Sequence, residues 1–221
     1  MATTVGASLY AGALDSASAT DGPSASVSIA SARYTGTGQC IQVPVTLNVS
    51  GGVSNGFAYW NTDNETLAGP TSDPTPATFF FDNEDAPGTD SIEMCPSSDQ
   101  AGSYTYSADV YFTNWDDEGG EQYAGRVTAR FTLGLARTKI VKIAKHTWQV
   151  KVVGEPYVVR APFIYLQALR KHVWHTISKG YASNAGKFAL KKRPAGRYRI
   201  QVHNDLDQGL QGSTSVVFRK P

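Results

Sequence analysis

Hydrophobic and polar residues alternate along much of the chain with the two-residue period of a β-strand. Every second side chain is apolar or aromatic in the three longest such segments, residues 41–49, 104–112 and 127–133. Shorter apolar or aromatic segments predict further strands at 27–29, 57–61, 79–81 and 92–94. About seven strands with this spacing are typical of an immunoglobulin-like β-sandwich. Because Pro44 lacks an N–H group, the strand that contains it is expected to have an edge or a bulge there.

The second part of the chain repeats the alternation, and no segment of useful length has a helical period. Strands are predicted at 148–152, 164–168, 173–177, 188–190, 198–202 and 216–218. The sequence therefore predicts an all-β protein of two tandem immunoglobulin-like β-sandwich domains, 24–136 and 138–221. Aromatic residues on alternating strands pack in a core by default, which we expect for Trp60, Trp148 and Trp174.

The first 23 residues are small and polar and have no hydrophobic periodicity. Ala17-Ser18-Ala19 matches the small-x-small pattern of a signal-peptidase site, but no positively charged segment precedes it. The segment is interpreted either as the remnant of an export signal or as an ordinary disordered tail. No window of the sequence is apolar for long enough to span a bilayer.

The charges divide the chain in two. Up to Ala136 there are three basic residues and sixteen acidic ones, whereas from Arg137 onward there are seventeen basic residues and three acidic ones. The net charges of the two parts, −13 and +14, sum to the +1 of the whole chain. Such a split favours two domains with different surfaces and places the boundary near residues 134–138.

Two cysteines, Cys40 and Cys95, both lie in the acidic part. In a strand-rich chain with features of an exported protein, such a pair favours one disulfide, which would close a loop of about 55 residues. The chain-entropy model assigns about 4 kcal/mol to a loop of that length. The alternative interpretation is two buried free thiols in a cytosolic protein.

A short motif occurs in both parts. Ala101-Gly102-Ser103-Tyr104 matches Ala195-Gly196-Arg197-Tyr198, and the two tyrosines are 94 residues apart, about one sandwich domain. The glycine allows the bend that enters a late strand, and the tyrosine then packs inward. We expect each hydroxyl to donate a hydrogen bond back to the preceding loop, as in a tyrosine corner.

Four segments of the basic part resemble the immunoglobulin-like or carboxypeptidase-regulatory-like modules of bacterial secreted proteins: 163–167, 173–177, 183–188 and 195–200. The resemblance covers most of residues 145–219 and implies an extracellular or cell-surface spacer, adhesive or polysaccharide-contacting module. The acidic part is more loosely similar to bacterial immunoglobulin-like domains, through Cys40, Trp60 and Cys95. It departs from them because Cys95 precedes Tyr104 rather than following it.

Two acidic clusters are candidates for binding Ca²⁺, which prefers six to eight oxygen ligands. In an immunoglobulin sandwich they would lie on loops at the same end of the domain: Asp82, Glu84 and Asp85, and Asp116, Asp117 and Glu118. No EF-hand spacing is present, and the alternative is two solvated acidic loops.

The basic part offers a candidate surface for an anionic polymer. Side chains expected to share its outer surface are Lys151, Lys187, Lys191, Arg197, Arg199 and Arg219. The alternatives are a highly charged solvated surface or a face that docks on a protein partner. No recognisable nucleic-acid-binding motif is present, so nucleic acid is not an expected partner.

Tyr111 and Trp115 lie near the end of one predicted strand and are candidates for stacking on carbohydrate. No catalytic motif and no cofactor motif is found. We expect a non-catalytic secreted or cell-surface binding and spacer protein, whose basic domain contacts the cell wall, another anionic polymer or a protein partner. The alternative is a carbohydrate-binding accessory module of a secreted polysaccharide hydrolase, and a small sandwich enzyme is a third class.

Overall fold

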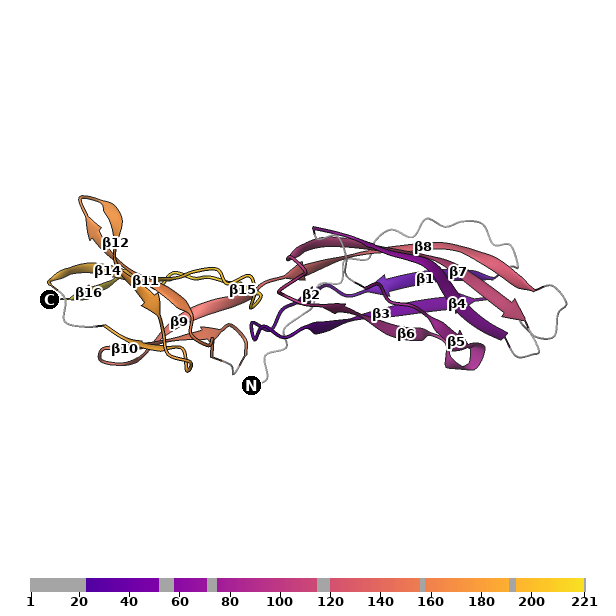
Figure 1. The fold of residues 1–221 in the computed structure, drawn as a ribbon, viewed down its shortest axis with the longest axis horizontal. Helices are drawn as coiled ribbons and strands as arrows, with labels where there is room; N and C mark the ends of the chain where they lie inside the picture. Colours follow the sequence, from indigo (N-terminus) through magenta and orange to yellow (C-terminus); the bar gives the residue numbers. More distant parts are fainter. Residues whose placement is uncertain are drawn as a thin grey trace, which may run out of the picture.

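The computed structural model describes residues 23–51, 58–70, 75–114, 120–155, 158–190 and 194–220. Within these residues the protein is an all-β structure of four sheets, and its one helical element is a single 3₁₀ turn, η1 (Asn83–Asp85). Figure 1 shows an elongated molecule in which one pair of sheets follows the other along the long axis.

Residues 24–134 form the first pair of sheets, which we call the N-terminal part. Its strands are β1 (Ser24–Ile29), β2 (Ala32–Arg33), β3 (Ile41–Ser50), β4 (Ala58–Ala68), β5 (Phe80–Asp82), β6 (Gly88–Met94), β7 (Gly102–Asn114) and β8 (Glu121–Gly134). One sheet has the order β1-β3-β6, and the other has the order β2-β8-β7-β4-β5. The alternation predicted for the long strands is confirmed, since the apolar positions of β3 and β7 are buried in one core around Trp60.

Pro44 is accommodated because β3 is longer than its neighbour β1. The last pair between these strands joins Ile29 to Val45, so β1 offers no partner at Pro44. On the other side, Pro44 lies opposite Ser91 of β6. The expectation of a local edge is therefore confirmed on the β1 side of the strand.

Residues 136–220 form the second pair of sheets, the C-terminal part. Its strands are β9 (Ala136–Ala144), β10 (Thr147–Val152), β11 (Phe163–Arg170), β12 (Val173–Tyr181), β13 (Lys187–Ala189), β14 (Gly196–Val202), β15 (Leu210–Gln211) and β16 (Phe218–Lys220). The orders are β13-β10-β9-β15 and β12-β11-β14-β16. Trp148 of the first sheet and Leu166, Ala168 and Ile200 of the second belong to one core cluster, so these two sheets pack face to face.

Strand β9 was not among the predicted strands, because Ile140 is its only large apolar inward residue and the outward positions Val141 and Ile143 are apolar. Ala136 and Thr138 are buried, while Arg137 and Lys139 between them are exposed. The chain passes from β8 to β9 through Leu135, which packs on the core of the N-terminal part, whereas Ala136 belongs to a core cluster of the C-terminal part. All strand pairs among the described residues stay within one part or the other.

Both repeated motifs form the predicted tyrosine corner. The Tyr104 hydroxyl donates to the carbonyl oxygen of Gln100 at 2.6 Å, and the Tyr198 hydroxyl donates to that of Pro194 at 2.7 Å. Both rings are buried, and in each case the acceptor lies four residues before the tyrosine. The same local solution thus anchors β7 in one part and β14 in the other.

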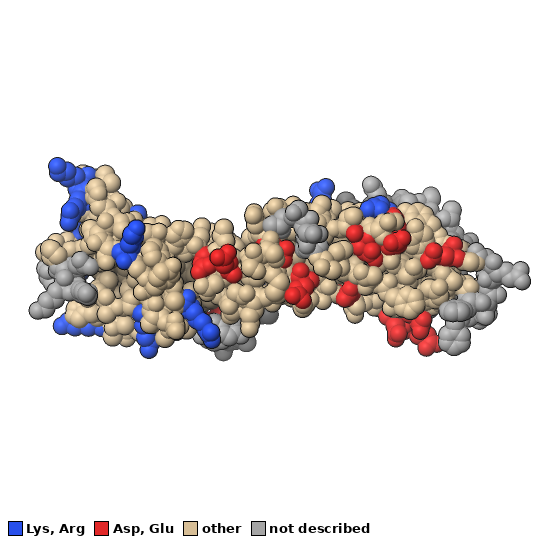
Figure 2. All heavy atoms as spheres, viewed as in Figure 1, with Lys and Arg blue, Asp and Glu red and all other residues tan. Residues whose placement is uncertain are grey.

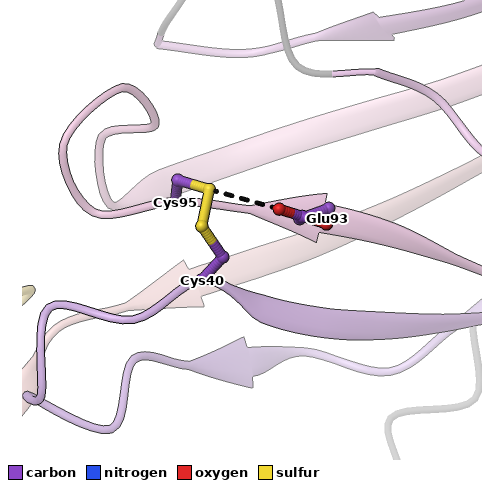
Figure 3. A group of neighbouring side chains, drawn as sticks. All are labelled: Cys40, Glu93 and Cys95. Atoms are coloured by element: carbon purple, nitrogen blue, oxygen red, sulfur yellow. Dashed lines mark hydrogen bonds between the residues drawn. A yellow bond between two sulfur atoms is a disulfide. The ribbon is translucent and has the colours of Figure 1, made fainter.

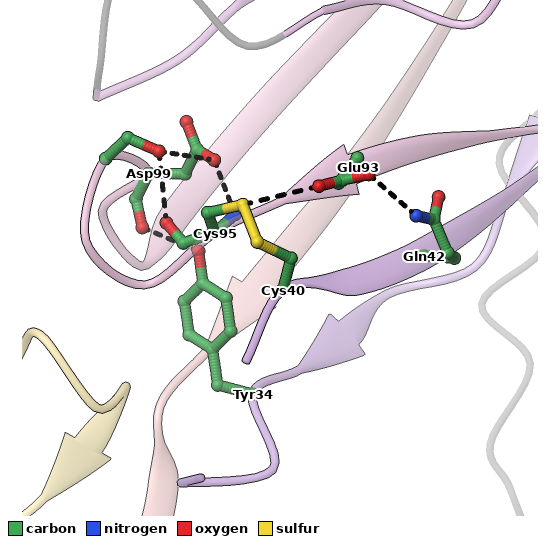
Figure 4. The surroundings of a disulfide bond; sticks show 7 residues. Tyr34, Cys40, Gln42, Glu93, Cys95 and Asp99 are labelled. Carbon is green, nitrogen blue, oxygen red and sulfur yellow. Dashed lines mark hydrogen bonds between the residues drawn. A yellow bond between two sulfur atoms is a disulfide. The ribbon is translucent and has the colours of Figure 1, made fainter. Parts of the chain in front are cut away.

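The predicted disulfide between Cys40 and Cys95 is present. It joins the residue before β3 to the residue after β6, next to the pair of Ile41 with Met94 (Figure 4). The turn that follows Cys95 is closed by Asp99, whose carboxylate accepts a hydrogen bond from the Cys95 N–H at 2.6 Å. The disulfide therefore ties together the ends of two neighbouring strands.

Candidate ligand-contact surfaces

The basic and acidic residues, which separate along the sequence, also separate on the surface of the molecule. Figure 2 shows Lys and Arg gathered mainly over the C-terminal part, and Asp and Glu mainly over the N-terminal part and the middle of the molecule. Among the described residues, the ion pair is Arg126 with Asp109, at 2.9 Å. Most described charges are therefore not neutralised by a neighbour within the chain.

The described half of the candidate Ca²⁺ site consists of Asp82, Glu84 and Asp85, all exposed around η1. Their carboxylates do not form a compact three-ligand group. The other half, Asp116, Asp117 and Glu118, lies outside the described residues. The Ca²⁺ site thus stays a prediction.

One compact group of metal-type side chains does occur in the described ranges, namely Cys40, Glu93 and Cys95 (Figure 3). Both sulfur atoms are used by the disulfide, so neither is a thiolate able to bind a metal. The Glu93 oxygen lies 3.6 Å from the Cys95 sulfur, which has no proton to donate, and the other oxygen of Glu93 accepts from Gln42 at 3.0 Å. This group is a structural feature of the strand ends rather than a metal site.

The structure does not bring the six candidate basic residues to one surface. Lys151 of β10 and Lys187 of β13 lie on the outer face of one sheet, because the residues beside them, Val150, Val152 and Phe188, face the core. The outer face of the opposite sheet carries the candidate arginines of β14 and β16, Arg197, Arg199 and Arg219. Lys191 lies outside the described residues.

The first of these faces contains a basic cluster that sequence reasoning missed. Lys139 of β9 lies directly opposite Lys151 of β10, and Arg137 lies two residues from Lys139 on the same face. No acidic residue occurs in the four strands of this sheet. Like charges directly opposite each other in a sheet are destabilising. Four basic residues thus concentrate positive charge on this surface, which we call the basic face: Arg137, Lys139, Lys151 and Lys187.

On the other sheet, Trp174 is not a core residue, contrary to the prediction. It lies in β12 opposite Leu169 of β11, on the outer face, and the guanidinium carbon of Arg199 is 4.6 Å from the centre of its ring. The register between β11 and β12 shifts after Leu166, and this bulge reverses which residues of β12 face outward. The sequence pattern does not reveal a bulge of this kind.

Tyr111, the candidate stacking residue, lies on the outer face of the five-stranded sheet of the N-terminal part. Cross-strand pairing places it in one row with Phe80, Asn61 and Tyr123, from β5, β4 and β8. The ring centres of Tyr111 and Tyr123 are 5.5 Å apart, and Phe80 is 74% exposed. We call these four residues the aromatic row; Trp115 lies outside the described residues.

Hydrogen-bonding groups lie within the aromatic row and beside it. The Asn61 amide donates to Glu121 at 3.0 Å, while its buried oxygen has no hydrogen-bond partner within the described residues. Hydrogen bonds from Asn64 and Arg126 hold the pKa of the Asp109 carboxyl below its ordinary value. Partial burial and the nearby charge of Asp109 raise the pKa of the Tyr111 phenol. The row is thus an aromatic surface bordered by hydrogen-bonding groups, which suits a sugar ring.

Comparison with known proteins adds little to these observations. No protein-family model matches the chain, and no curated protein matches it. A search of solved structures finds a crystal structure of CBD12 from CALX1.2, at 8% sequence identity and a TM-score of 0.31, over 81% of this chain and 80% of that one. A similarity at that level carries no argument about function, which has to come from the surfaces themselves. No helix in the described ranges is long and apolar enough to cross a membrane.

Proposed function

We propose that the protein is a non-catalytic, exported binding protein of two tandem immunoglobulin-like domains, whose C-terminal domain contacts an anionic polymer. The observation that carries this proposal is the basic face, where Lys139 and Lys151 are cross-strand neighbours without an acidic residue in the sheet. The disulfide supports an oxidising, extracellular location. An anionic polymer of the bacterial cell wall is the partner class that fits both the basic face and an extracellular location.

Retention of the full chain on an immobilised polyanion tests the proposal. We expect retention at low salt and release as the ionic strength rises from about 0.1 M to about 1 M, because screening weakens contacts between exposed charges. Lys139→Gln and Lys151→Gln together should lower the salt concentration needed for release. Lys142→Gln together with Lys145→Gln is the matched control, since it also removes two exposed charges, at the end of β9 and in the turn before β10. Retention that does not depend on salt or on the basic face would refute the proposal.

A second candidate function, a carbohydrate-binding accessory role, is supported by the aromatic row. Aromatic rings on a flat sheet surface stack on sugar rings through contacts that salt does not weaken. Pull-down of the full chain on insoluble neutral polysaccharide, such as cellulose or chitin, tests this role. Tyr111→Ala with Tyr123→Ala should abolish retention, whereas Val216→Ala, which shortens an exposed apolar side chain of the C-terminal part, should not. Equal retention of all three proteins would exclude the row as the contact.

A further inference from the structure

The outer face of the sheet β12-β11-β14-β16 carries an ordered set of polar and aromatic side chains. Leu166, Ala168 and Ile200 point into the core, so the residues that alternate with them in β11 and β14 point outward. These outward residues include Gln167 and Arg199, which are paired across the two strands. The face is therefore a surface separate from the basic face on the opposite sheet.

Arg199 is held in a fixed orientation on this face. Its guanidinium lies over the Trp174 ring, and its Nε–H donates to the Gln167 side-chain oxygen at 2.7 Å. Gln167 is fixed in turn, because its amide donates to the Thr176 hydroxyl at 3.3 Å. No carboxylate forms an ion pair with Arg199 among the described residues. The guanidinium is thus a pre-oriented cation, and its terminal N–H groups suit two-pronged binding of a carboxylate.

Two pockets, which together we call the groove, begin at Gln167, the residue that accepts the hydrogen bond from Arg199. A pocket of about 300 Å³ is lined by Gln167, Tyr165 and His203, and it adjoins a second pocket of about 490 Å³ that shares Tyr165 and His203. The distance from Arg199 to His203 along an extended strand is roughly 13 Å, at about 3.3 Å per residue. The groove is therefore longer than one sugar ring.

The walls of the larger pocket combine aromatic and hydrogen-bonding groups. Phe163 packs edge-on against Tyr165 at 5.3 Å and against Tyr181 at 4.9 Å, and the Tyr181 ring is 76% exposed. At the far end, Asp205 and Asp207 line the pocket. Both oxygens of Asp205 accept hydrogen bonds from Gln208, whereas Asp207 is exposed.

From this arrangement we propose that the groove binds a carboxylated polysaccharide, of the uronic-acid type. Arg199 pairs with a sugar carboxylate, Tyr165 and Tyr181 contact the faces of neighbouring sugar rings, and Asp207 accepts hydrogen bonds from sugar hydroxyls. Polyphosphate has no hydroxyl groups that could donate hydrogen bonds to Asp205 and Asp207, so it would bring negative charge against the two aspartates without such bonds. A neutral polysaccharide would leave the oriented guanidinium without its partner. The inference rests on the proposed function, because it names the ligand class and a second contact site for it.

Titration of the full chain with oligogalacturonate tests the inference, with its methyl ester and polyphosphate as comparison ligands. We expect the free acid to bind more tightly than the ester or polyphosphate. The change in tryptophan fluorescence on binding should be smaller in Trp174→Phe than in the wild-type protein. Arg199→Gln should weaken binding of the free acid by about tenfold or more, the size expected for a lost charge-assisted contact. It should leave binding of the ester nearly unchanged. Arg33→Gln is the matched control, as an exposed arginine of the N-terminal part.

The outcome also separates this inference from the proposal for the basic face. If Lys139→Gln with Lys151→Gln abolishes binding of oligogalacturonate while Arg199→Gln has no effect, the groove is wrong and the basic face stands. If Arg199→Gln weakens binding of oligogalacturonate, and Lys139→Gln with Lys151→Gln changes neither this binding nor retention on the polyanion, the groove stands and the basic face is wrong. If the free acid, the ester and polyphosphate bind equally or not at all, the groove is not a site for carboxylated sugars.

Discussion

Gly209 of the C-terminal part packs against Tyr34 of the N-terminal part so closely that an added Cβ at Gly209 would lie 2.6 Å from the Cβ of Tyr34. Tyr34 itself is held by two hydrogen bonds. Its N–H donates to Gly134 at 3.0 Å, and its hydroxyl donates to the Asp99 carbonyl at 2.6 Å (Figure 4). The Gly209 carbonyl accepts from the Ala136 N–H at 2.8 Å. The contact therefore joins the turn beside the disulfide to the start of β9.

Gly209→Ala is expected to destabilise the protein through this contact. Gly209 has a φ of +67°, which costs a residue with a side chain about 1 kcal/mol, and the contact with Tyr34 adds an overpacking penalty of about 1–3 kcal/mol. Gly120 has the same φ of +67° and nothing within 4 Å of an added Cβ, so Gly120→Ala measures the backbone cost alone. Urea denaturation of the two variants should show the larger loss for Gly209→Ala, and equal losses would contradict the tight contact.

Removal of the disulfide should lower the free energy of unfolding by about 4 kcal/mol, because the bond closes a loop between residues 55 apart in sequence. The variant Cys40→Ala with Cys95→Ala is compared with wild-type protein by urea denaturation, with and without reductant. Reductant should destabilise the wild-type protein to the level of the variant and leave the variant unchanged. A variant as stable as the oxidised wild type would show that other contacts already hold the ends of β3 and β6 together.

Local patterns predicted the parts of this fold that depend on neighbours in sequence. The alternation of β3 and β7 marked their buried faces, and the motifs ending in Tyr104 and Tyr198 marked two corners. The disulfide was also predicted correctly, since the chain has only two cysteines and the alternative, two free thiols, applied only to a cytosolic protein. The strand faces and the corners are each encoded within a few neighbouring residues. The disulfide is encoded by the presence of only two cysteines, so that each has a single possible partner.

Features that depend on pairing between distant strands were not predictable in the same way. Trp174 faces outward because of a register shift between β11 and β12, which no local pattern encodes. The pairing of Lys139 with Lys151 required β9, in which apolar residues occupy outward as well as inward positions, so that no alternation is visible. Likewise, Phe80 and Tyr123 join Tyr111 only through the register of four strands. Candidate surface residues were therefore identified individually, but not grouped correctly.

The two tyrosine corners are expected to contribute independently to stability. Tyr104→Phe and Tyr198→Phe each remove one hydroxyl that donates to a loop carbonyl, at a cost of about 1 kcal/mol. Because the two rings belong to separate core clusters, the cost in the double variant should be the sum of the single costs. Urea denaturation of the three variants checks the prediction. A double variant that deviates by more than about 0.5 kcal/mol from the sum would reveal coupling between the parts.

Alkaline pH should destabilise the protein through its buried tyrosines. The Tyr106 hydroxyl donates to the Ala77 carbonyl at 3.0 Å, and burial, with the charges of Glu65 and Asp90, raises its pKa above the ordinary 10.0. Burial and the charge of Asp99 likewise raise the pKa of Tyr34. Below about pH 10 both folded and unfolded states keep these protons, so the stabilising effect is complete. Above that pH the unfolded state loses its protons first, and stability falls by up to about 1.4 kcal/mol per pH unit for each group.

Melting temperatures from about pH 8 to about pH 11 test this sign. The melting temperature of the wild-type protein should be constant up to about pH 10 and then fall. Tyr106→Phe should start from a lower stability, because it loses a hydrogen bond, but decline less steeply, because it has one fewer group to titrate on unfolding. Tyr181→Phe is the control at an exposed ring. Since the described cysteines are both in the disulfide, no free thiol is present to promote its exchange during the measurement. An identical decline in wild type and Tyr106→Phe would show that the buried phenol does not govern the alkaline limit.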